Sequence, residues 1–316
     1  MRPTAYRTER KPVPLASGRV SVIIPLYNHA SYIAEAVESV LAQGDIVGEM
    51  IVIDDGSKDE SAAVMRRLAH IDSRIRFETQ ENQGAHATIN RGLRIARGEY
   101  LAILNSDDAY EVGRLSQLVR ALDIDEGSAI ACSSIAFMDS TGKTIKNPWF
   151  DDALENYKKV RDLGVAIMDA NFAMTTSNFL LRRSLIEIIG GFAPLRYAHD
   201  MEFLLRFAAL GNRLAFVDKK LLRYRFHATN TIREDHRRVR LDWAICAAFF
   251  IHLVWQHGCS EDRTRRLVVE AVLDRHELRR AVDLCLPRLA RSGATNLEVS
   301  GVLEDPLLCQ QMMDVL

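Results

Sequence analysis

Short apolar runs alternate with amphipathic stretches in the first third of the chain. Three runs of mainly apolar residues have the length and composition of buried strands in a parallel sheet: 20–24, 51–53 and 100–104. The stretches between them carry apolar residues at helical spacing: 31–43, 61–68 and 85–96. Residues 76–78 form a further short strand. This alternation predicts an α/β fold with a doubly wound, mostly parallel sheet and right-handed crossovers.

Polar residues stand directly after these strands. Asn105, Ser106, Asp107 and Asp108 follow the run 100–104, and ligands of open α/β sheets bind beyond the carboxyl ends of the strands. Two adjacent carboxylates repel each other unless a positive group neutralises them, and a divalent cation carrying a diphosphate would do so. The pattern predicts a metal-bound nucleotide at this point. The alternative is that one of the two acids caps a helix that begins near Val112.

Three other strands end in a similar way. Pro25-Leu26-Tyr27-Asn28 follows the first strand, and Asp54-Asp55-Gly56-Ser57 follows the second. Asn82-Gln83-Gly84 follows the short strand, where a glycine lets the backbone approach a ligand closely. Asp-Gly-Ser is also a good turn and helix cap, and Tyr27 could simply pack in the core.

The last third of the chain is helical in pattern. A thirteen-residue apolar run, 243–255, follows three arginines. Such a segment could lie on a membrane surface, but we favour a core helix of the C-terminal module or a dimer interface, because the length is usual for a buried helix. Further helical patterns follow it: 262–272, 278–289 and 296–302. The organisation expected is a flexible arm (1–18), a main domain (19–235) and an all-helical C-terminal module (236–316).

Composition narrows the class of protein and its expected location. The net charge of −1 gives no reason to expect a nucleic-acid partner. The five cysteines have no metal-binding spacing and are typical of reduced thiols in the cytoplasm: Cys132, Cys246, Cys259, Cys285 and Cys309. The N-terminus lacks the apolar core of a signal peptide, and no run is long enough to span a bilayer. A cytoplasmic location is expected, with the inner face of the membrane as an option.

The motifs together resemble family 2 of the glycosyltransferases, which have the GT-A fold. The resemblance starts with Val-Ser-Val-Ile-Ile-Pro-Leu-Tyr-Asn (20–28) and Ile-Asp-Asp-Gly-Ser-Lys-Asp (53–59). It continues with Asn-Gln-Gly (82–84) and Arg-Gly-Glu-Tyr-Leu-Ala-Ile-Leu-Asn-Ser-Asp-Asp (97–108). Downstream segments extend the match through residue 232: 177–183, 190–192, 199–202 and 224–230. The resemblance implies a nucleotide-binding half up to about residue 110, an acceptor half over 111–235, and helices flanking a mostly parallel sheet.

The resemblance also assigns roles at the nucleotide site. Asp107 would ligate Mn²⁺ or Mg²⁺, Asp108 would support it, and His227 would complete the metal shell unless it is only structural. The implied nucleotide-binding residues are Pro25, Tyr27, Asp54, Asp55, Asn82, Gly84, Asn105, Ser106, Asp107 and Arg225, the last of these at the phosphates. Asn105 departs from the family, which often has Asp there, but an amide can still bond a ribose hydroxyl. Ile89 also departs, since many relatives have Arg before the residue matching Asn90.

The acceptor side carries the expected catalytic base. Asp200 matches the family's general base, which takes the acceptor proton, and its alternative is a helix N-cap. Glu202 is the fallback base. His199 replaces a Glu that is usual in the family, and it either tunes Asp200 or faces solvent. His29, His86 and His236 have no special context and are expected at the surface.

These assignments predict an inverting glycosyltransferase. It would move a sugar from a nucleotide donor, a UDP-sugar, to a hydroxyl of a glycan or lipid-linked acceptor in bacterial surface polysaccharide synthesis. A rival is a non-catalytic sugar-nucleotide-binding or scaffold protein, which the departures at Asn105, Ile89 and His199 favour. A nucleotidyltransferase is disfavoured because no glycine-rich phosphate loop with a following lysine is present.

Overall fold

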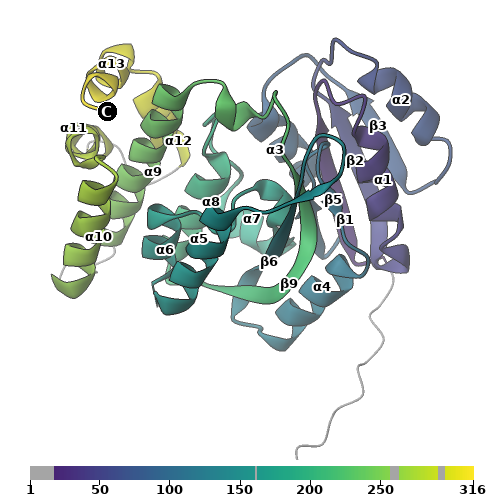
Figure 1. The fold of residues 1–316 in the computed structure, drawn as a ribbon, viewed down its shortest axis with the longest axis horizontal. Helices are drawn as coiled ribbons and strands as arrows, with labels where there is room; N and C mark the ends of the chain where they lie inside the picture. Colours follow the sequence, from purple (N-terminus) through teal and green to yellow (C-terminus); the bar gives the residue numbers. More distant parts are fainter. Residues whose placement is uncertain (1–17, 161, 257–262, 291–295) are drawn as a thin grey trace, which may run out of the picture.

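A computed structural model describes residues 18–160, 162–256, 263–290 and 296–316. It contains one nine-stranded mixed sheet flanked by helices, with a group of helices at one end of the molecule (Figure 1). The strand order is β3-β2-β1-β4-β8-β6-β9-β5, and β7 pairs with β6 outside this path. The predicted α/β class with a C-terminal helical appendage is therefore confirmed.

The N-terminal half, which is expected to bind the nucleotide and is called the nucleotide-binding half below, follows the predicted alternation. Its strands are parallel: β1 (Val20–Leu26), β2 (Val47–Asp54), β3 (Ile75–Thr79) and β4 (Tyr100–Ile103). Its helices are α1 (Ile33–Leu41), α2 (Ser61–Leu68) and α3 (Ala85–Ile95). The chain builds β1 to β3 outward and then returns to place β4 on the other side of β1. This reversal makes a topological switch point at the carboxyl ends of β1 and β4, where ligands of such sheets bind.

The second half makes the sheet mixed. Strand β8 (Leu180–Arg182) runs antiparallel to both β4 and β6 (Ser128–Met138), while β9 (Arg213–Arg225) runs parallel to β6. Two-residue strands complete the sheet: β5 (Ala109–Tyr110) and β7 (Thr144–Ile145). Strand β9 lies between β6 and β5, so it does not form an edge of the sheet.

Helices cover this half as well. They are α4 (Arg114–Ile124), α5 (Pro148–Lys159), α6 (Leu163–Asp169), α7 (Arg183–Ile189) and α8 (His199–Ala209). Three short 3-10 helices accompany them: Gly44–Ile46, Thr176–Asn178 and Thr231–Arg233. Helix α4 is preceded by Gly113 with a positive φ of 76°, and no side chain caps it. The alternative that Asp107 or Asp108 only caps this helix is therefore wrong.

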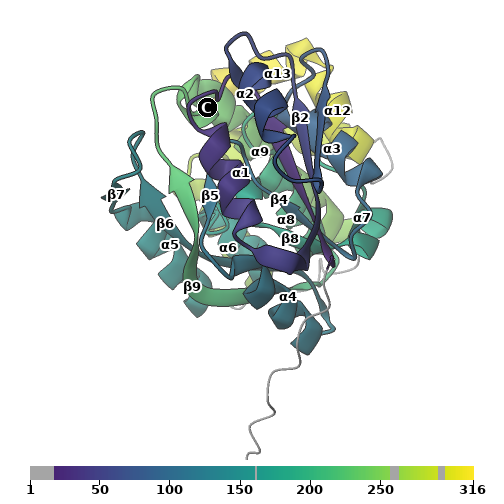
Figure 2. The same cartoon turned by 90° about the vertical axis from the view of Figure 1, so that its right-hand side faces the viewer.

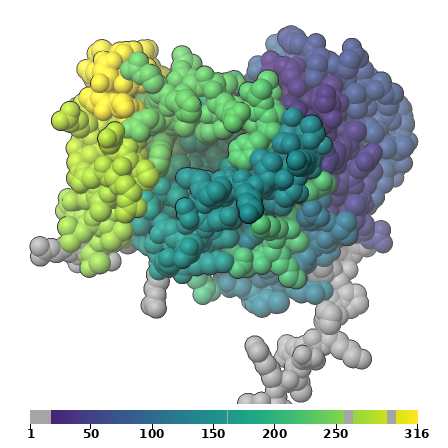
Figure 3. All heavy atoms as spheres, in the orientation of Figure 1, coloured from purple at the N-terminus to yellow at the C-terminus, as the bar shows by residue number. Residues whose placement is uncertain are grey.

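The C-terminal helices lie at the end of the molecule opposite the nucleotide-binding half, as the space-filling view also shows (Figures 1 and 3). They are α9 (His236–Gln256), α10 (Arg263–Arg275), α11 (Arg279–Leu289), α12 (Asn296–Leu303) and α13 (Pro306–Asp314), of which only α13 was not foreseen. Turning the molecule by 90° brings the sheet in front of α9 (Figure 2).

Helix α9 uses its apolar face within the chain. Phe249 and Phe250 are almost fully buried, and the core of the main domain continues into this helix. Helix α6 can approach α9 closely because residue 164 is glycine: a Cβ there would lie 2.2 Å from the Phe250 ring. Most of the apolar face on which the dimer and membrane alternatives rested is therefore used within the chain, although Trp255 is 39% exposed. Within the described residues, no helix is both long enough and apolar enough to cross a bilayer.

Two other expectations fall partly outside the described residues. The arm 1–18 does so except for Gly18. Cys259 also lies outside, and the four described cysteines are free thiols.

Candidate active site

The candidate site lies at the carboxyl ends of β1, β2 and β4. Backbone hydrogen bonds continue past the strand ends, from Asp55 to Leu26 and from Leu104 to Ile23. The segments that follow these strands therefore leave the sheet side by side. This arrangement brings the polar residues predicted for the nucleotide site to one edge.

Asp107 forms the centre of a possible metal site. Its Oδ2 shares a 2.8 Å hydrogen bond with Nε2 of His227, which follows β9. His29, which follows β1, completes a group whose ligand atoms all lie within 4.8 Å of one another. One carboxylate and two imidazoles at this spacing suit a divalent ion. The sequence placed His29 at the surface, which is wrong; its position directly after the strand-end residues Tyr27-Asn28 was the signal that could have identified it.

The electrostatics of this group favour an ionised carboxylate. Burial acts to raise the pKa of Asp107, but the His227 hydrogen bond and the nearby histidines outweigh it, so the pKa lies below its usual value. Burial lowers the pKa of His29, which favours the neutral imidazole that binds metals. Burial and the charge of Asp107 raise the pKa of Asp108 well above its usual value.

Asp108 and Arg225 shape the loop. The Asp108 carboxylate accepts hydrogen bonds from Ser177 Oγ (2.6 Å) and from the Arg225 backbone N–H (3.0 Å). The Arg225 guanidinium donates to the backbone oxygen of Asp107 (2.8 Å), pairs with Glu35 and lies over the Tyr32 ring. Arg225 is 2% exposed, so the predicted phosphate contact would require it to leave these partners. In this geometry Arg225 holds the metal-site loop in place.

Asn105 and Ser106 also bond within the protein. The Asn105 amide donates to Thr175 Oγ1 (3.0 Å) and accepts from Thr176 Oγ1 (3.1 Å). A ribose contact by this amide would have to compete with both threonines. Ser106 Oγ shares a 2.8 Å hydrogen bond with Nδ1 of His29.

The two acids after β2 differ in their partners. Asp55 accepts from the backbone N–H groups of Gln83 and Gly84, both at 2.8 Å, and so fixes the loop that precedes α3. Gly84 has a φ of +87° there, which favours glycine. Asp54 is 4% exposed, and its Oδ1 has no partner among the described residues. A buried acceptor without a partner is costly, so Asp54 is the better placed of the two to accept a donor from a bound base.

The other predicted nucleotide residues are at this edge. Tyr27 is 43% exposed, so the alternative that it packs in the core is wrong and its ring is available to a base. Pro25 is half-buried and Asn82 is exposed. His86 is half-buried rather than at the surface, and the charges of His199 and Asp55 both influence its pKa, which burial lowers. The half-buried position of His86 was not predicted, because a lone histidine inside a helix pattern carries no local signal.

Asp200 occupies the first turn of α8. It is 8% exposed, accepts a 3.1 Å hydrogen bond from the Asn171 amide, and has a pKa raised to about 6 by burial. The residue that precedes the helix is Ala198, so the alternative N-cap role is wrong. His199 bonds the Leu195 carbonyl (3.2 Å), and burial lowers its pKa to about 4.

Glu202 has a structural environment. It is fully buried and forms an ion pair with Arg206 at 2.8 Å, and Arg206 also bonds the Ile189 and Gly191 carbonyls. A carboxylate held in this way cannot reach an acceptor hydroxyl. The geometry therefore does not support the fallback role of Glu202.

Tyr224 and the segment 171–178 relate Asp200, the expected base, to the loop that carries Asp107. Burial raises the pKa of Tyr224, and the negative charges of Asp108, Asp107 and Asp200 raise it further. All three carboxylates therefore lie within electrostatic reach of one phenol. The segment 171–178 also joins them, since its Asn171 bonds Asp200 and its Thr175 and Thr176 bond Asn105.

Helix α9 supports the loop before Asp200. The Asp242 carboxylate accepts a 2.8 Å hydrogen bond from the Tyr197 backbone N–H, and burial raises its pKa to about 6. Asp242→Ala should lower the free energy of unfolding by about 1–3 kcal/mol, because it leaves buried N–H groups without an acceptor. Urea unfolding measures this change, with the exposed Asp283→Ala as control. Equal stability of the two variants would contradict the supporting role.

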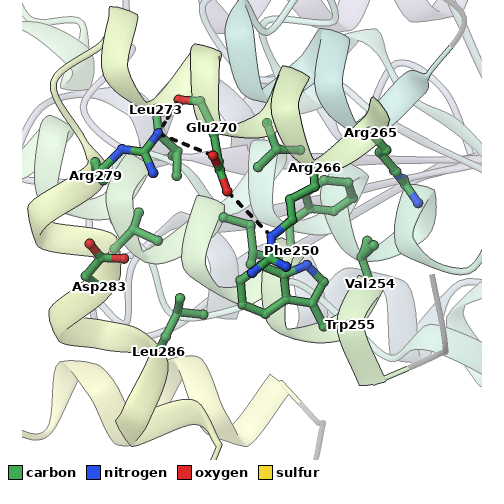
Figure 4. Close-up of a pocket in the computed structure, with 13 residues that line it drawn as sticks. Phe250, Val254, Trp255, Arg265, Arg266, Glu270, Leu273, Arg279, Asp283 and Leu286 are labelled. Atoms are coloured by element: carbon green, nitrogen blue, oxygen red, sulfur yellow. Dashed lines mark hydrogen bonds and ion pairs between the residues drawn. The ribbon is translucent and has the colours of Figure 1, made fainter. Parts of the chain in front are cut away.

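A pocket lies between α9, α10 and α11, away from the sheet edge (Figure 4). Phe250 lines it, and the Arg266 guanidinium lies 5.3 Å from the centre of the Trp255 ring. Arg266 and Arg279 both approach Glu270, at 3.5 and 4.0 Å. We assign no ligand to this pocket.

Comparisons with known proteins agree with this geometry. The sequence model described as glycosyl transferase family 2 matches residues 21–190. EpsH of Bacillus subtilis is 31% identical over 228 residues, covering 70% of this chain and 64% of EpsH. Glycosyltransferase GlyG of Streptococcus pneumoniae is 27% identical over 236 residues, covering 71% of this chain and 75% of GlyG. The chain spans less than two thirds of the length of the first curated relatives that it matches.

Solved structures share the fold. S. aureus TarS 1–349 in complex with UDP-GlcNAc superposes with a TM-score of 0.56 at 16% identity, covering 94% of this chain and 90% of TarS 1–349. The mannosyltransferase PcManGT from Pyrobaculum calidifontis, in complex with GDP-Man and Mn²⁺, gives 0.55 at 20% identity, covering 97% and 89%. At these identities the likeness establishes the fold alone.

Proposed function

The chain belongs to family 2 of the glycosyl transferases, and from this premise we propose that it transfers a sugar from a nucleotide-sugar donor to an acceptor hydroxyl with inversion at the anomeric carbon. One observation carries the proposal: the segment 171–178 hydrogen-bonds both to the Asp200 carboxylate and to Asn105, two residues before Asp107 of the Asp107–His227 pair. For a single displacement, the base and the diphosphate site must both lie close to the anomeric carbon.

We propose a UDP-sugar as the donor. The unpaired Oδ1 of Asp54 can accept the imide N–H of uracil, and the exposed Tyr27 ring can pack on the base. TarS 1–349 in complex with UDP-GlcNAc is consistent with this choice, whereas PcManGT in complex with GDP-Man keeps guanosine as the alternative.

The metal would be Mn²⁺ or Mg²⁺, with Asp107 and His227 as protein ligands. Bound there, a divalent ion supplies Lewis-acid stabilisation of the negative charge on the diphosphate. Asp108 and Arg225 hold the loop that presents Asp107. The buried contacts of these two residues keep the ligand carboxylate in place before any donor binds.

Asp200 would act as the general base. Its carboxylate takes the proton of the acceptor hydroxyl while that oxygen bonds to the anomeric carbon and the bond to the diphosphate oxygen breaks. The Asn171 hydrogen bond fixes the orientation of the carboxylate. Burial leaves it more basic than an exposed aspartate, which favours proton acceptance.

The pH dependence of transfer follows from this carboxylate. Below about pH 6 Asp200 is protonated and cannot accept a proton, so kcat/KM should rise with pH through an apparent pKa of about 6 and then level. Initial rates of nucleotide release across pH 4.5–8.5 would measure this profile. A rate that is flat across pH 5–7 would contradict the assignment.

The acceptor is proposed to be a glycan or a lipid-linked glycan, in bacterial surface polysaccharide synthesis at the cytoplasmic face of the membrane. This part of the proposal rests on the family alone. The segment 171–178 lies between the expected base and the metal loop, and it is the part of the chain that we expect the acceptor to contact.

Release of free nucleoside diphosphate tests the activity. The full-length protein is incubated with UDP-sugars and GDP-sugars, MnCl₂ and candidate acceptors, and UDP or GDP is quantified. Acceptor-dependent release that Asp200→Asn lacks supports the proposal. Nucleotide binding without release would instead favour the scaffold function, and pyrophosphate release would indicate nucleotidyl transfer.

A further inference from the structure

His29 is the histidine that the family resemblance leaves without a role. We infer that His29 is a third protein ligand of the metal ion, and that the set of two imidazoles and one carboxylate selects a transition-metal ion such as Mn²⁺ over Mg²⁺. This inference rests on the proposed function, since the ion is the one that would hold the donor diphosphate. To the proposed function, the inference adds His29 as a metal ligand and a preference of the site for Mn²⁺ over Mg²⁺.

The backbone at His29 is fixed by the neighbouring loop. The N–H groups of Asn28 and His29 donate to Ser57 Oγ and Ser61 Oγ, both at 2.9 Å, and the Ala30 N–H donates to Asp59 Oδ2 at 3.0 Å. Asn28 itself has a positive φ of 55°, and its side chain accepts from the Lys58 N–H. The turn that aims His29 toward Asp107 is therefore built from several contacts between the β1 and β2 loops.

The two imidazole rings are also oriented. Nδ1 of His29 bonds Ser106 Oγ at 2.8 Å, and Nδ1 of His227 bonds Thr229 Oγ1 at 2.9 Å. A hydroxyl can donate or accept, so each ring can carry its proton on Nδ1 and present the lone pair of Nε2 to an ion. The rings stand at 86° to each other with centroids 5.4 Å apart, and both contact the Tyr32 ring.

Oxygen ligands from the protein are scarce at this site. The first position of the strand-end motif is the amide of Asn105, which is engaged by two threonines. Asp108 is 1% exposed and faces Ser177 and the Arg225 backbone. Asp107 is thus the one carboxylate of the cluster that the described residues form.

This donor set determines the preferred ion. Mg²⁺ demands oxygen ligands in a near-ideal octahedron, whereas imidazole nitrogens suit first-row transition ions. Two nitrogens beside one carboxylate therefore weaken Mg²⁺ binding relative to Mn²⁺ or Co²⁺.

Metal titration of the full-length protein tests the inference without turnover. Binding of MnCl₂ and MgCl₂ is measured in the presence of UDP, and pulsed EPR counts the nitrogens bound to Mn²⁺. Wild type should bind Mn²⁺ at least about tenfold more tightly than Mg²⁺ and show two nitrogens. His29→Ala should lose at least about tenfold in Mn²⁺ affinity and show one nitrogen, whereas His70→Ala, at an exposed histidine, should match wild type.

A second variant changes the donor rather than removing it. His29→Asp supplies an oxygen, so it should narrow the preference for Mn²⁺ over Mg²⁺ by at least about tenfold. One nitrogen in wild type, or equal binding of both ions, would overturn the inference while leaving glycosyl transfer intact. Two nitrogens in a protein that never releases nucleoside diphosphate would instead retain the ligand assignment and reject the proposed function.

Discussion

Asp200→Asn is expected to lower the rate of glycosyl transfer by about two to four orders of magnitude, the range for a positioned general base. The amide keeps the size of the side chain and its hydrogen bond with Asn171 can be retained after a flip, but the amide cannot take a proton. Donor and metal binding should stay unchanged, because neither involves Asp200. Initial rates and UDP binding measured on the same preparation separate the two effects.

The control for this variant is Asp152→Asn, at an exposed aspartate of α5, which should transfer at the wild-type rate. Near-normal transfer by Asp200→Asn would exclude the proposed mechanism. The role could not simply move to Glu202, because that carboxylate is fully buried in its ion pair with Arg206. Because Glu202 cannot replace Asp200, the rate of Asp200→Asn decides whether Asp200 is the base.

Hydrophobic periodicity predicted the nucleotide-binding half closely. The run 61–68 is the whole of α2, and 85–96 differs from α3 by one residue. These segments are amphipathic along their own length, so local sequence carries the signal. Parallel strands that are buried on both faces are equally visible, because they read as short apolar runs.

The second half was less predictable for physical reasons. Strands β5 and β7 have two residues each and exist only through pairing with distant strands. The antiparallel direction of β8 follows from its place between β4 and β6, which no local pattern encodes. Helix α5 was not predicted, although Asn147 and Pro148 form a normal helix start.

The site shows the same division. The strand-end acids could be located from the sequence because each stands directly after an apolar run. What they contact could not: Asp55 fixes a loop, Asp54 keeps an unpaired oxygen, and Asp108 faces inward. His29 and His227 are almost two hundred residues apart and meet only in the folded chain.

Asp107→Ala is expected to abolish the part of nucleotide binding that depends on metal. Asp107 is the carboxylate of the histidine–aspartate cluster, and its removal leaves two imidazoles, which supply no negative charge to offset that of a divalent ion. In wild type, UDP with MnCl₂ at 100 times the dissociation constant should stabilise the fold by roughly 2.7 kcal/mol. Thermal unfolding with UDP, with and without MnCl₂, should show this metal-dependent increment in wild type and none in the variant.

Asp151→Ala, at an exposed acid of α5, is the matched control and should keep the full increment. The Asp107→Ala variant should remain folded, because residue 107 is held mainly through its backbone oxygen by Arg225. That contact survives the substitution. Asn230 also lies 3.2 Å from the His227 ring nitrogen that would lose its carboxylate partner. A metal-dependent increment of wild-type size in Asp107→Ala would therefore reject Asp107 as a ligand, since neither unfolding nor collapse of the histidine pair could produce it.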